Sequence, residues 1–181
     1  IQTDFYVSAV PFFNFKSMLG EDVYKRYFSE VNDLSSSPIV NIHLKFDKDI
    51  SSIFSSEFIG LLNSTSQWVF KVTNDQVCVI ISSAGEIAEK SKEVIIDLAI
   101  GELKICFPEL IGFKVNSARV IKEMRATFVP DSKSLSNRPG NVTNISNFFI
   151  AGDWTDTELP ATIEGAVKSS KNCVSEIMKL S

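Results

Sequence analysis

Two stretches of the chain carry the spacing of amphipathic helices, in which apolar residues recur every three or four positions. The clearer one covers residues 92–107, where Ser91 is placed to cap the first turn and Pro108 ends the pattern. The other covers residues 161–180, and a shorter helix is predicted near Asp22–Phe28. On the C-terminal helix the expected apolar positions are Ala166, Val167, Val174, Ile177 and Met178.

Strand patterns fill much of the remaining chain. Residues Pro38–Phe46 alternate apolar with polar side chains, which predicts a strand with one buried and one wet face. Short apolar runs predict further strands over residues 5–10, 58–62, 67–72, 76–82, 114–128 and 147–151. The polar stretch Pro130–Asn144 is predicted to be a surface connection. The pattern favours an α+β fold with a mixed, largely antiparallel sheet. The two ends of the chain look like α/β pieces, and its middle looks like α+β.

The composition excludes several classes of function. The chain has 181 residues, of which 44% are hydrophobic, and a net charge of -4 with no basic run, so a generic nucleic-acid binder is not expected. One histidine and three scattered cysteines exclude a Cys/His zinc site, and no metal site is expected. The apolar neighbours of the cysteines predict buried free thiols in a reducing compartment. No apolar run approaches the about 20 residues of a membrane span.

Residues 147–167 hold the strongest candidate binding site. An apolar strand ends in Gly152-Asp153, a polar turn follows, and a helix is predicted with Pro160 at its first position. Gly152 would let the backbone come close to a ligand, and Gly165 and Ala166 would let a flat ring or a neighbouring element lie close. The Asp153 carboxylate would accept hydrogen bonds from hydroxyl groups. The free N–H groups of the helix start favour an anion or an electron-rich carbonyl. The alternative is a tight strand–turn–helix in which Asp153 only caps the helix.

The longer string AGDWTDTELPATIEGAVKSS resembles the C-terminal flavin-binding signature of the FAD-dependent amine oxidase and phytoene desaturase superfamily. Within it, the chain is most similar to the squalene-associated FAD-dependent desaturases of the hydroxysqualene dehydroxylase type. The resemblance extends upstream through FYVSAVP, SPIVNIHL, QWVF, RATF and RPG. The chain departs from the pattern at Glu158, where glycine is usual, and at Ser169-Ser170, which replaces Ser-Gly.

The resemblance implies a two-domain flavoprotein whose chain passes between domains. Residues 1–37 would be a returning strand and connector of a Rossmann-like FAD domain, 38–130 the substrate domain, and 131–181 the C-terminal FAD-domain segment. Hydride transfer would join flavin to a long isoprenoid such as a squalene or carotenoid precursor. The alternatives are a flavin amine oxidase of the same superfamily and a non-catalytic, partner-binding module on this fold.

The resemblance also implies which residues contact FAD. Asp153 would bind its ribityl or diphosphate region, the backbone at the helix start would face the flavin's pyrimidine end, and Trp154 and Thr155 would line the approach to the ring. The expected cofactor-binding residues are Gly152, Asp153, Trp154, Thr155, Pro160, Ala161, Thr162 and Ile163. No catalytic side chain is assigned.

The eight glycines form no G-x-G-x-x-G, the diphosphate-binding fingerprint that the family carries near its N-terminus. Because the chain starts with Ile1 and not with Met, and its first segment, Phe5–Pro11, already has the pattern of a core strand, it is expected to be a fragment whose partner is a missing N-terminal FAD-binding half. Alone, it is expected to bind FAD poorly and to be inactive.

Other residues each leave two interpretations open. Trp68 and Phe70 would line an apolar substrate tunnel or pack in the core, and His43 would act as a general base or as a hydrogen-bonding surface histidine. The run Phe12-Phe13-Asn14-Phe15 would touch a membrane or lie under the missing domain. A cytoplasmic protein is expected, with or without peripheral membrane contact.

Overall fold

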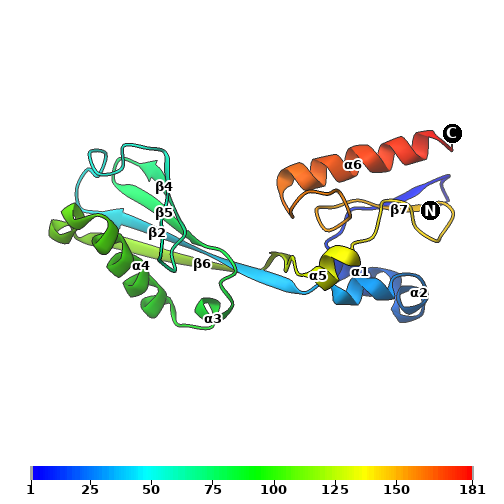
Figure 1. Ribbon diagram of the computed structural model, residues 1–181, viewed down its shortest axis with the longest axis horizontal. Helices are drawn as coiled ribbons and strands as arrows, with labels where there is room; N and C mark the ends of the chain where they lie inside the picture. The colour runs from blue at the N-terminus through cyan, green and yellow to red at the C-terminus, as the bar shows by residue number, and fades with distance from the viewer. Residues whose placement is uncertain (1, 181) are drawn as a thin grey trace. The chain divides into compact units, whose positions relative to one another are not determined.

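A computed structural model describes residues 2–180 and divides the chain into two compact units (Figure 1). Unit 1 combines Ile1–Ser36 with Thr127–Ser181, and unit 2 is Ser37–Ala126. The corresponding boundaries predicted from the sequence are 37/38 and 130/131. No helix in the described part of the chain is long and apolar enough to cross a membrane.

Unit 2 is built on a five-stranded sheet in the order β3-β4-β5-β2-β6. Strands β3, β4, β5 and β2 pair antiparallel with their neighbours. Strands β2 and β6 also run antiparallel, because Asp47 N donates to Lys114 O beyond one end and Val129 N donates to Ser35 O beyond the other. The strands are β2 (Ser36–Phe46), β3 (Phe58–Gly60), β4 (Trp68–Thr73), β5 (Gln76–Ile81) and β6 (Val115–Phe128). The expected largely antiparallel sheet is confirmed.

One face of this sheet is covered by helix α4 (Lys92–Cys106), as Figure 1 shows. Alternate residues of β2, β4 and β5 bury toward the helix, which presents a stripe spaced four residues apart. The buried residues on these elements are Val40, Ile42, Leu44, Val69, Val77, Val79, Ile81, Ile95, Ala99 and Leu103. Ser91 caps the helix as predicted, because its Oγ accepts from Val94 N at 3.3 Å. The short helices α3 (Gly85–Ala88) and η2 (Pro108–Gly112) flank α4 in sequence.

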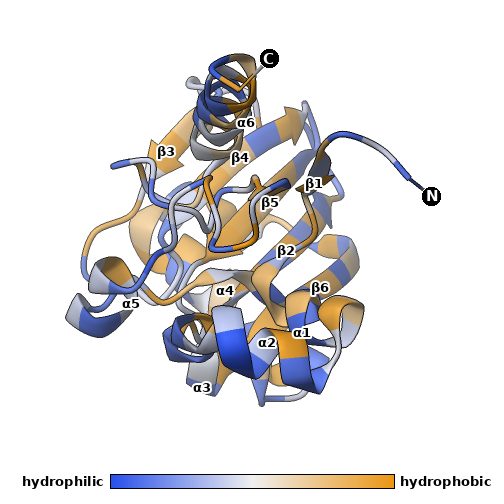
Figure 2. Ribbon diagram, turned by 90° about the vertical axis from the view of Figure 1, so that its right-hand side faces the viewer, coloured by the Kyte–Doolittle hydropathy of each residue, from blue (hydrophilic) through white to orange (hydrophobic). Residues whose placement is uncertain are grey.

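Unit 1 centres on a parallel pair of short strands, β1 (Tyr6–Ser8) and β7 (Phe148–Ile150). Helix α6 (Ile163–Met178) lies on one side of the pair, and α1 (Phe12–Leu19) and α2 (Glu21–Tyr27) lie on the other (Figures 1 and 2). Because strand residues alternate, Phe149 contacts the α6 side while Ile150 joins a cluster with Phe15 and Trp154. Two further short helices are η1 (Ser29–Asp33) and α5 (Ser132–Ser136).

Two sequence predictions about helix α6 are corrected by the structure. Helix α6 begins at Ile163, three residues after Pro160, because Thr162 is the residue that caps it. The inner face of α6 carries the small residues Gly165, Ser169 and Cys173, while its larger apolar residues Val167, Val174 and Met178 are exposed. Close packing against the strand and loop beneath therefore selects small side chains.

The other corrections concern exposure. The segment Pro130–Asn144 is not simply a surface connection, because Ser134, Arg138 and Asn141 are buried in it. Cys106 is exposed, Cys78 is half-buried and Cys173 is buried, so the expectation of three buried thiols is wrong for Cys106. All three thiols are free.

Candidate functional site: the β7–α6 junction and the open sheet face

The loop between β7 and α6 begins with a backbone shape that requires glycine. Gly152 has φ +154°, and a Cβ there would lie 2.6 Å from Trp154 Nε1. At the helix start, a Cβ on Gly165 would lie 2.7 Å from Pro160 O. The chain's own indole and carbonyl therefore fill the space beside both glycines. At Gly165 this confirms the alternative in which a neighbouring element lies close, while the approach of a ligand at Gly152 stays a prediction.

A buried polar network ties this loop to α6. The Ser169 hydroxyl accepts from Gly152 N at 3.0 Å and from Asn141 Nδ2 at 2.9 Å, and it lies 2.7 Å from the Thr155 hydroxyl. Asn141 also donates to Ile150 O at 2.8 Å. Since Ser169 and Thr155 are fully buried, these bonds satisfy groups that have no access to water.

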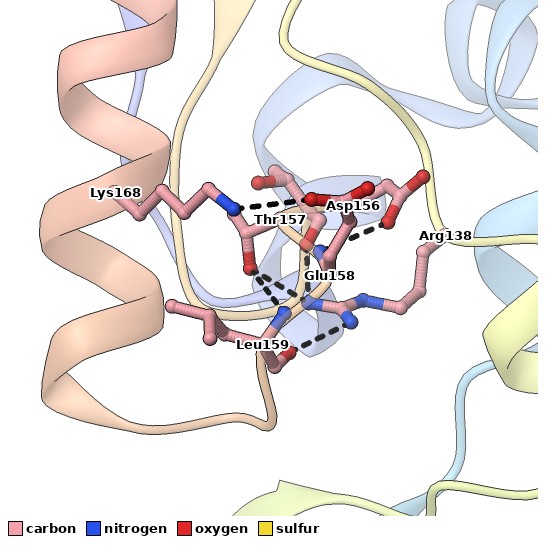
Figure 3. Close-up of polar contacts among 7 residues, drawn as sticks. Arg138, Asp156, Thr157, Glu158, Leu159 and Lys168 are labelled. Carbon is pink, nitrogen blue, oxygen red and sulfur yellow. Dashed lines mark hydrogen bonds and ion pairs between the residues drawn. The ribbon is translucent and has the colours of Figure 1, made fainter.

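Arg138 holds the same loop from the other side (Figure 3). Its guanidinium donates to Leu159 O at 2.9 Å, to Asp153 O at 3.0 Å and also to Thr155 O. The guanidinium also lies over the aromatic ring of Phe128, whose centroid is 5.0 Å from the guanidinium carbon. Burial lowers the pKa of Arg138, although an arginine remains charged under all ordinary conditions. Sequence reasoning missed this residue, together with Asn141 and Ser169.

The backbone at Glu158 explains why the family pattern has glycine at this position. Its φ of +61° is in the left-handed region, where glycine is the residue without a steric penalty. The side chain is exposed and its Oε2 lies 3.3 Å from Lys168 Nζ, as drawn in Figure 3. The positive φ at this position is thus the physical reason for the usual glycine.

The predicted cofactor-binding residues divide into buried and accessible groups. Trp154 is 2% exposed and donates from Nε1 to Val10 O at 3.1 Å, and Thr155 is fully buried. Their side chains pack inside unit 1, and their part in lining the approach to a flavin ring stays a prediction. Gly152, Asp153 and Ala161 are half-buried, while Pro160, Thr162 and Ile163 are exposed.

The accessible groups have unused hydrogen-bonding capacity. Thr162 Oγ1 accepts from Gly165 N at 3.1 Å, but among residues 2–180 no acceptor pairs with the backbone N–H of Ile163 or Glu164. The Asp153 carboxylate likewise has no donor in the described part of the chain. The Asp153 carboxylate and the open start of α6, nine to eleven residues later in the sequence, therefore flank one loop.

The second candidate surface is the sheet face of unit 2 opposite α4. Phe58, Phe70 and Cys78 are cross-strand neighbours there, as are Gly60, Trp68 and Ile80. The Phe58 ring lies 6.2 Å from that of Trp68 and 6.0 Å from that of Phe70. These three rings are between 38% and 58% exposed, so they are not core residues. We call this set (Phe58, Trp68, Phe70) the aromatic face.

A polar region adjoins the aromatic face on strands β5 and β2. His43 Nδ1 lies 3.4 Å from Gln76 Nε2, and His43 Nε2 lies 3.8 Å from Cys78 Sγ. Burial raises the pKa of the Cys78 thiol, so it stays protonated at neutral pH. A shallow cavity of about 380 Å³ is lined here by His43, Lys45, Gln76, Ser117, Ala118, Arg119 and Ile121. In the described residues no cluster of three or more His, Cys, Asp or Glu side chains could hold a metal ion.

Comparison with known proteins identifies the family. A family model described as "Flavin containing amine oxidoreductase" matches residues 1–178. The chain belongs to this family. Membership of the flavin-containing amine oxidoreductases implies a flavin cofactor and places the chain among oxidoreductases.

Two relatives and one solved structure refine this picture. Hydroxysqualene dehydroxylase of Sinorhizobium fredii is 31% identical over 131 residues, which are 72% of this chain and 30% of the relative. The 15-cis-phytoene desaturase of Solanum lycopersicum is 27% identical over 195 residues, covering 99% of this chain and 33% of the relative. The crystal structure of a putative protoporphyrinogen oxidase from Exiguobacterium sp. 255-15 covers 98% of this chain and 42% of its own, with a TM-score of 0.67 and 11% identity.

These findings confirm the resemblance to the hydroxysqualene dehydroxylase type. They also confirm the α+β fold class, because the similar solved structures have the fold of the flavin-containing amine oxidoreductases. The chain spans about a third of the length of the curated relatives. What the whole protein does is therefore a matter for proposal.

Proposed function

We propose that this chain is the C-terminal part of an FAD-dependent oxidoreductase that moves a hydride between flavin and a long apolar isoprenoid. The observation that carries the substrate class is the aromatic face. Three large rings stand together on an uncovered sheet face, and soluble proteins use such contiguous apolar patches for binding. In Figure 2, β3 is coloured as hydrophobic along its length. A chain of isoprene units offers the matching surface without needing charged partners.

The β7–α6 junction fits one part of a flavin cofactor. The Asp153 carboxylate is a free acceptor for hydroxyl groups such as those of a ribityl chain, and the N–H groups of Ile163 and Glu164 are free donors at the positive end of the α6 dipole. Ile163 is 87% exposed, so nothing in unit 1 covers this helix start. When bound, the flavin would supply the hydride chemistry, while these groups would bind and orient it.

Unit 1 carries apolar surface that supports a larger FAD domain. Strands β1 and β7 form a two-stranded parallel sheet, whereas parallel sheets are normally wide and covered on both faces. Val7 on β1 is 52% exposed, and Val167, Val174 and Met178 on α6 are between 42% and 68% exposed. We infer that further strands and helices of the FAD domain cover these residues.

The first test of this function measures FAD binding. Because the 181 residues lack a G-x-G-x-x-G loop, the chain alone is expected to hold FAD only weakly, and a protein that also supplies such a loop is expected to purify with bound yellow flavin. Sub-micromolar FAD binding by the chain alone would contradict the division of the cofactor site. A complete protein that never binds flavin would favour a non-catalytic module.

The second test addresses the substrate. In the complete flavoprotein, Trp68→Ala and Phe70→Ala are expected to raise the KM for a squalene- or phytoene-like substrate, because each removes apolar contact area. The control is Ile105→Ala, which removes an apolar side chain that is 79% exposed on α4. Equal KM values in all variants would exclude the aromatic face as the binding surface, and turnover of a primary amine would favour the amine oxidase alternative.

A further inference from the structure

The hydrogen bonds that the Arg138 guanidinium donates within the described residues all go to one loop. Besides Leu159 O, Asp153 O and Thr155 O, its guanidinium approaches Trp154 O at 3.5 Å and Thr157 Oγ1 at 3.4 Å. Four of these five acceptors are backbone carbonyls from residues 153–159, which we call the Arg138 loop. Pro139 O adds a bond by accepting from Asp156 N at 2.8 Å.

The absence of a carboxylate at this guanidinium is informative. Arg138 is 9% exposed, and buried charges are ordinarily paired with an opposite charge. Among the described residues, however, no salt bridge includes Arg138, while Lys133 and Lys168 in the same unit each contact an acidic side chain. Asp156 and Asp153 act on Arg138 only through their more distant charges. The planar, forked guanidinium of Arg138 therefore sets the shape of a backbone segment, residues 153–159.

The direction of the carbonyls also sets the direction of their peptide N–H groups. In a trans peptide the N–H points away from the C=O, so turning Asp153 O toward Arg138 turns Trp154 N–H the other way. Trp154 N–H has no acceptor among residues 2–180. This free donor adjoins the Asp153 carboxylate, so Arg138 determines how two neighbouring polar groups are presented.

We propose that Arg138 is a positioning residue whose guanidinium fork fixes the Arg138 loop in the shape that presents Asp153 and the start of α6 to the cofactor. This rests on the proposed function, in which the β7–α6 junction holds flavin. The fork geometry is essential because five N–H groups in one plane reach carbonyls from residues that follow one another around the loop. A lysine would keep the charge but has three donors on a single nitrogen.

The experiment compares Arg138→Lys and Arg138→Ala with the parent in the complete flavoprotein. The matched control is Arg26→Ala, because Arg26 also stacks on an aromatic ring, at 5.2 Å from Tyr27, but is exposed. Two readouts are taken: the FAD dissociation constant from the recovery of flavin fluorescence, and amide hydrogen exchange of residues 153–159. Circular dichroism of the FAD-free proteins shows whether each variant is folded.

Arg138→Ala is expected to weaken FAD binding by about tenfold or more and to speed exchange in the Arg138 loop. The FAD affinity of Arg138→Lys is expected to lie between those of the parent and Arg138→Ala. Added guanidinium ion is expected to restore FAD binding to Arg138→Ala and to leave the FAD affinity of Arg26→Ala unchanged. Rescue by a free guanidinium separates positioning from a general loss of stability.

FAD affinities of both Arg138 variants within about twofold of the parent would overturn the proposal. If Arg138→Ala does not fold, Arg138→Lys decides, since it keeps the buried charge and loses only the fork. If the parent itself holds no flavin, the proposed function fails. The exchange readout then stands alone, and unchanged exchange of residues 153–159 in Arg138→Lys overturns the role of Arg138 in fixing the loop.

Discussion

Replacing Ser169 by alanine is expected to destabilise unit 1 through one orphaned backbone group. Ser169 Oγ is the acceptor for Gly152 N at 3.0 Å, and this N–H has no other partner in the described residues. Asn141 keeps its bond to Ile150 O, and Thr155 Oγ1 keeps its bond to Gly152 O at 2.9 Å, so both lose only part of their hydrogen bonding. One buried N–H left without an acceptor costs about 1–3 kcal/mol, and the weakened bonds add roughly 1 kcal/mol. The expected loss is about 2–4 kcal/mol.

The neighbouring residue provides a matched control. Ser170 is exposed, and its hydroxyl only donates back to Val167 O within α6 at 2.8 Å. Ser170→Ala is therefore expected to change the free energy of unfolding by less than about 0.5 kcal/mol, with any gain coming from the higher helix propensity of alanine.

Tryptophan fluorescence during urea unfolding measures both variants. Trp154 is buried in unit 1, and Trp68→Phe removes the only other tryptophan of the 181 residues, so the signal then reports unit 1. If Ser169→Ala and Ser170→Ala shift the unfolding free energy equally, the buried network does not stabilise the junction and the reasoning about Gly152 N–H is wrong.

Three further predictions follow from single residues. Glu158→Gly is expected to be more stable than Glu158→Ala by about 1 kcal/mol, because both lose the Lys168 contact and only glycine relieves the positive φ; equal thermal unfolding would contradict this. Burial alone would raise the pKa of Glu102, but hydrogen bonds from Ser66 and Thr65 hold it below its ordinary value. Its contribution to stability is thus present at neutral pH and lost as the pH falls below about 4.3, so Glu102→Gln should flatten that part of a pH–stability curve measured by urea unfolding. Ser91→Ala removes the α4 cap and is expected to cost about 1 kcal/mol in the same assay, and no loss would mean that water replaces the cap.

The regular elements with strong periodicity were predictable from sequence. The alternation over Pro38–Phe46 matches β2, Ser36–Phe46, since every second side chain there must face α4. The helix predicted over 92–107 matches α4, Lys92–Cys106, because a cap and a proline bound its apolar stripe. Helix α1 was not predicted, since three phenylalanines, polar residues and one lysine are mixed in it without a clear period. Phe15 of the Phe12–Phe15 run is fully buried in unit 1, so the burial of that ring needs no further domain.

Helix α6 shows where hydropathy misleads. Gly165, Ser169 and Cys173 occupy its inner face, whereas the larger apolar residues Val167, Val174 and Met178 are exposed and Ile177 is partly buried. The spacing of four residues between these small side chains was visible in the sequence, but its meaning depends on how closely the strand and loop approach. Gly165 illustrates this, because a single Cβ would collide with Pro160 O. Small residues at helical spacing therefore mark a packed face only when a partner is known to lie against it.

The segment Pro130–Asn144 shows why Arg138 could not be assigned from sequence. A stretch of polar residues with glycine and proline is predicted to be exposed on the assumption that water satisfies its polar groups. Here Arg138 and Asn141 instead bond to carbonyls and a hydroxyl 9 to 28 residues downstream. Backbone carbonyls leave no trace in a residue pattern, so the acceptors of Arg138 are invisible until the chain is folded. The role of Arg138, which contacts no carboxylate, is consequently visible only from the acceptors of its buried N–H groups. Those acceptors lie in residues 153–159, the loop that Arg138 holds.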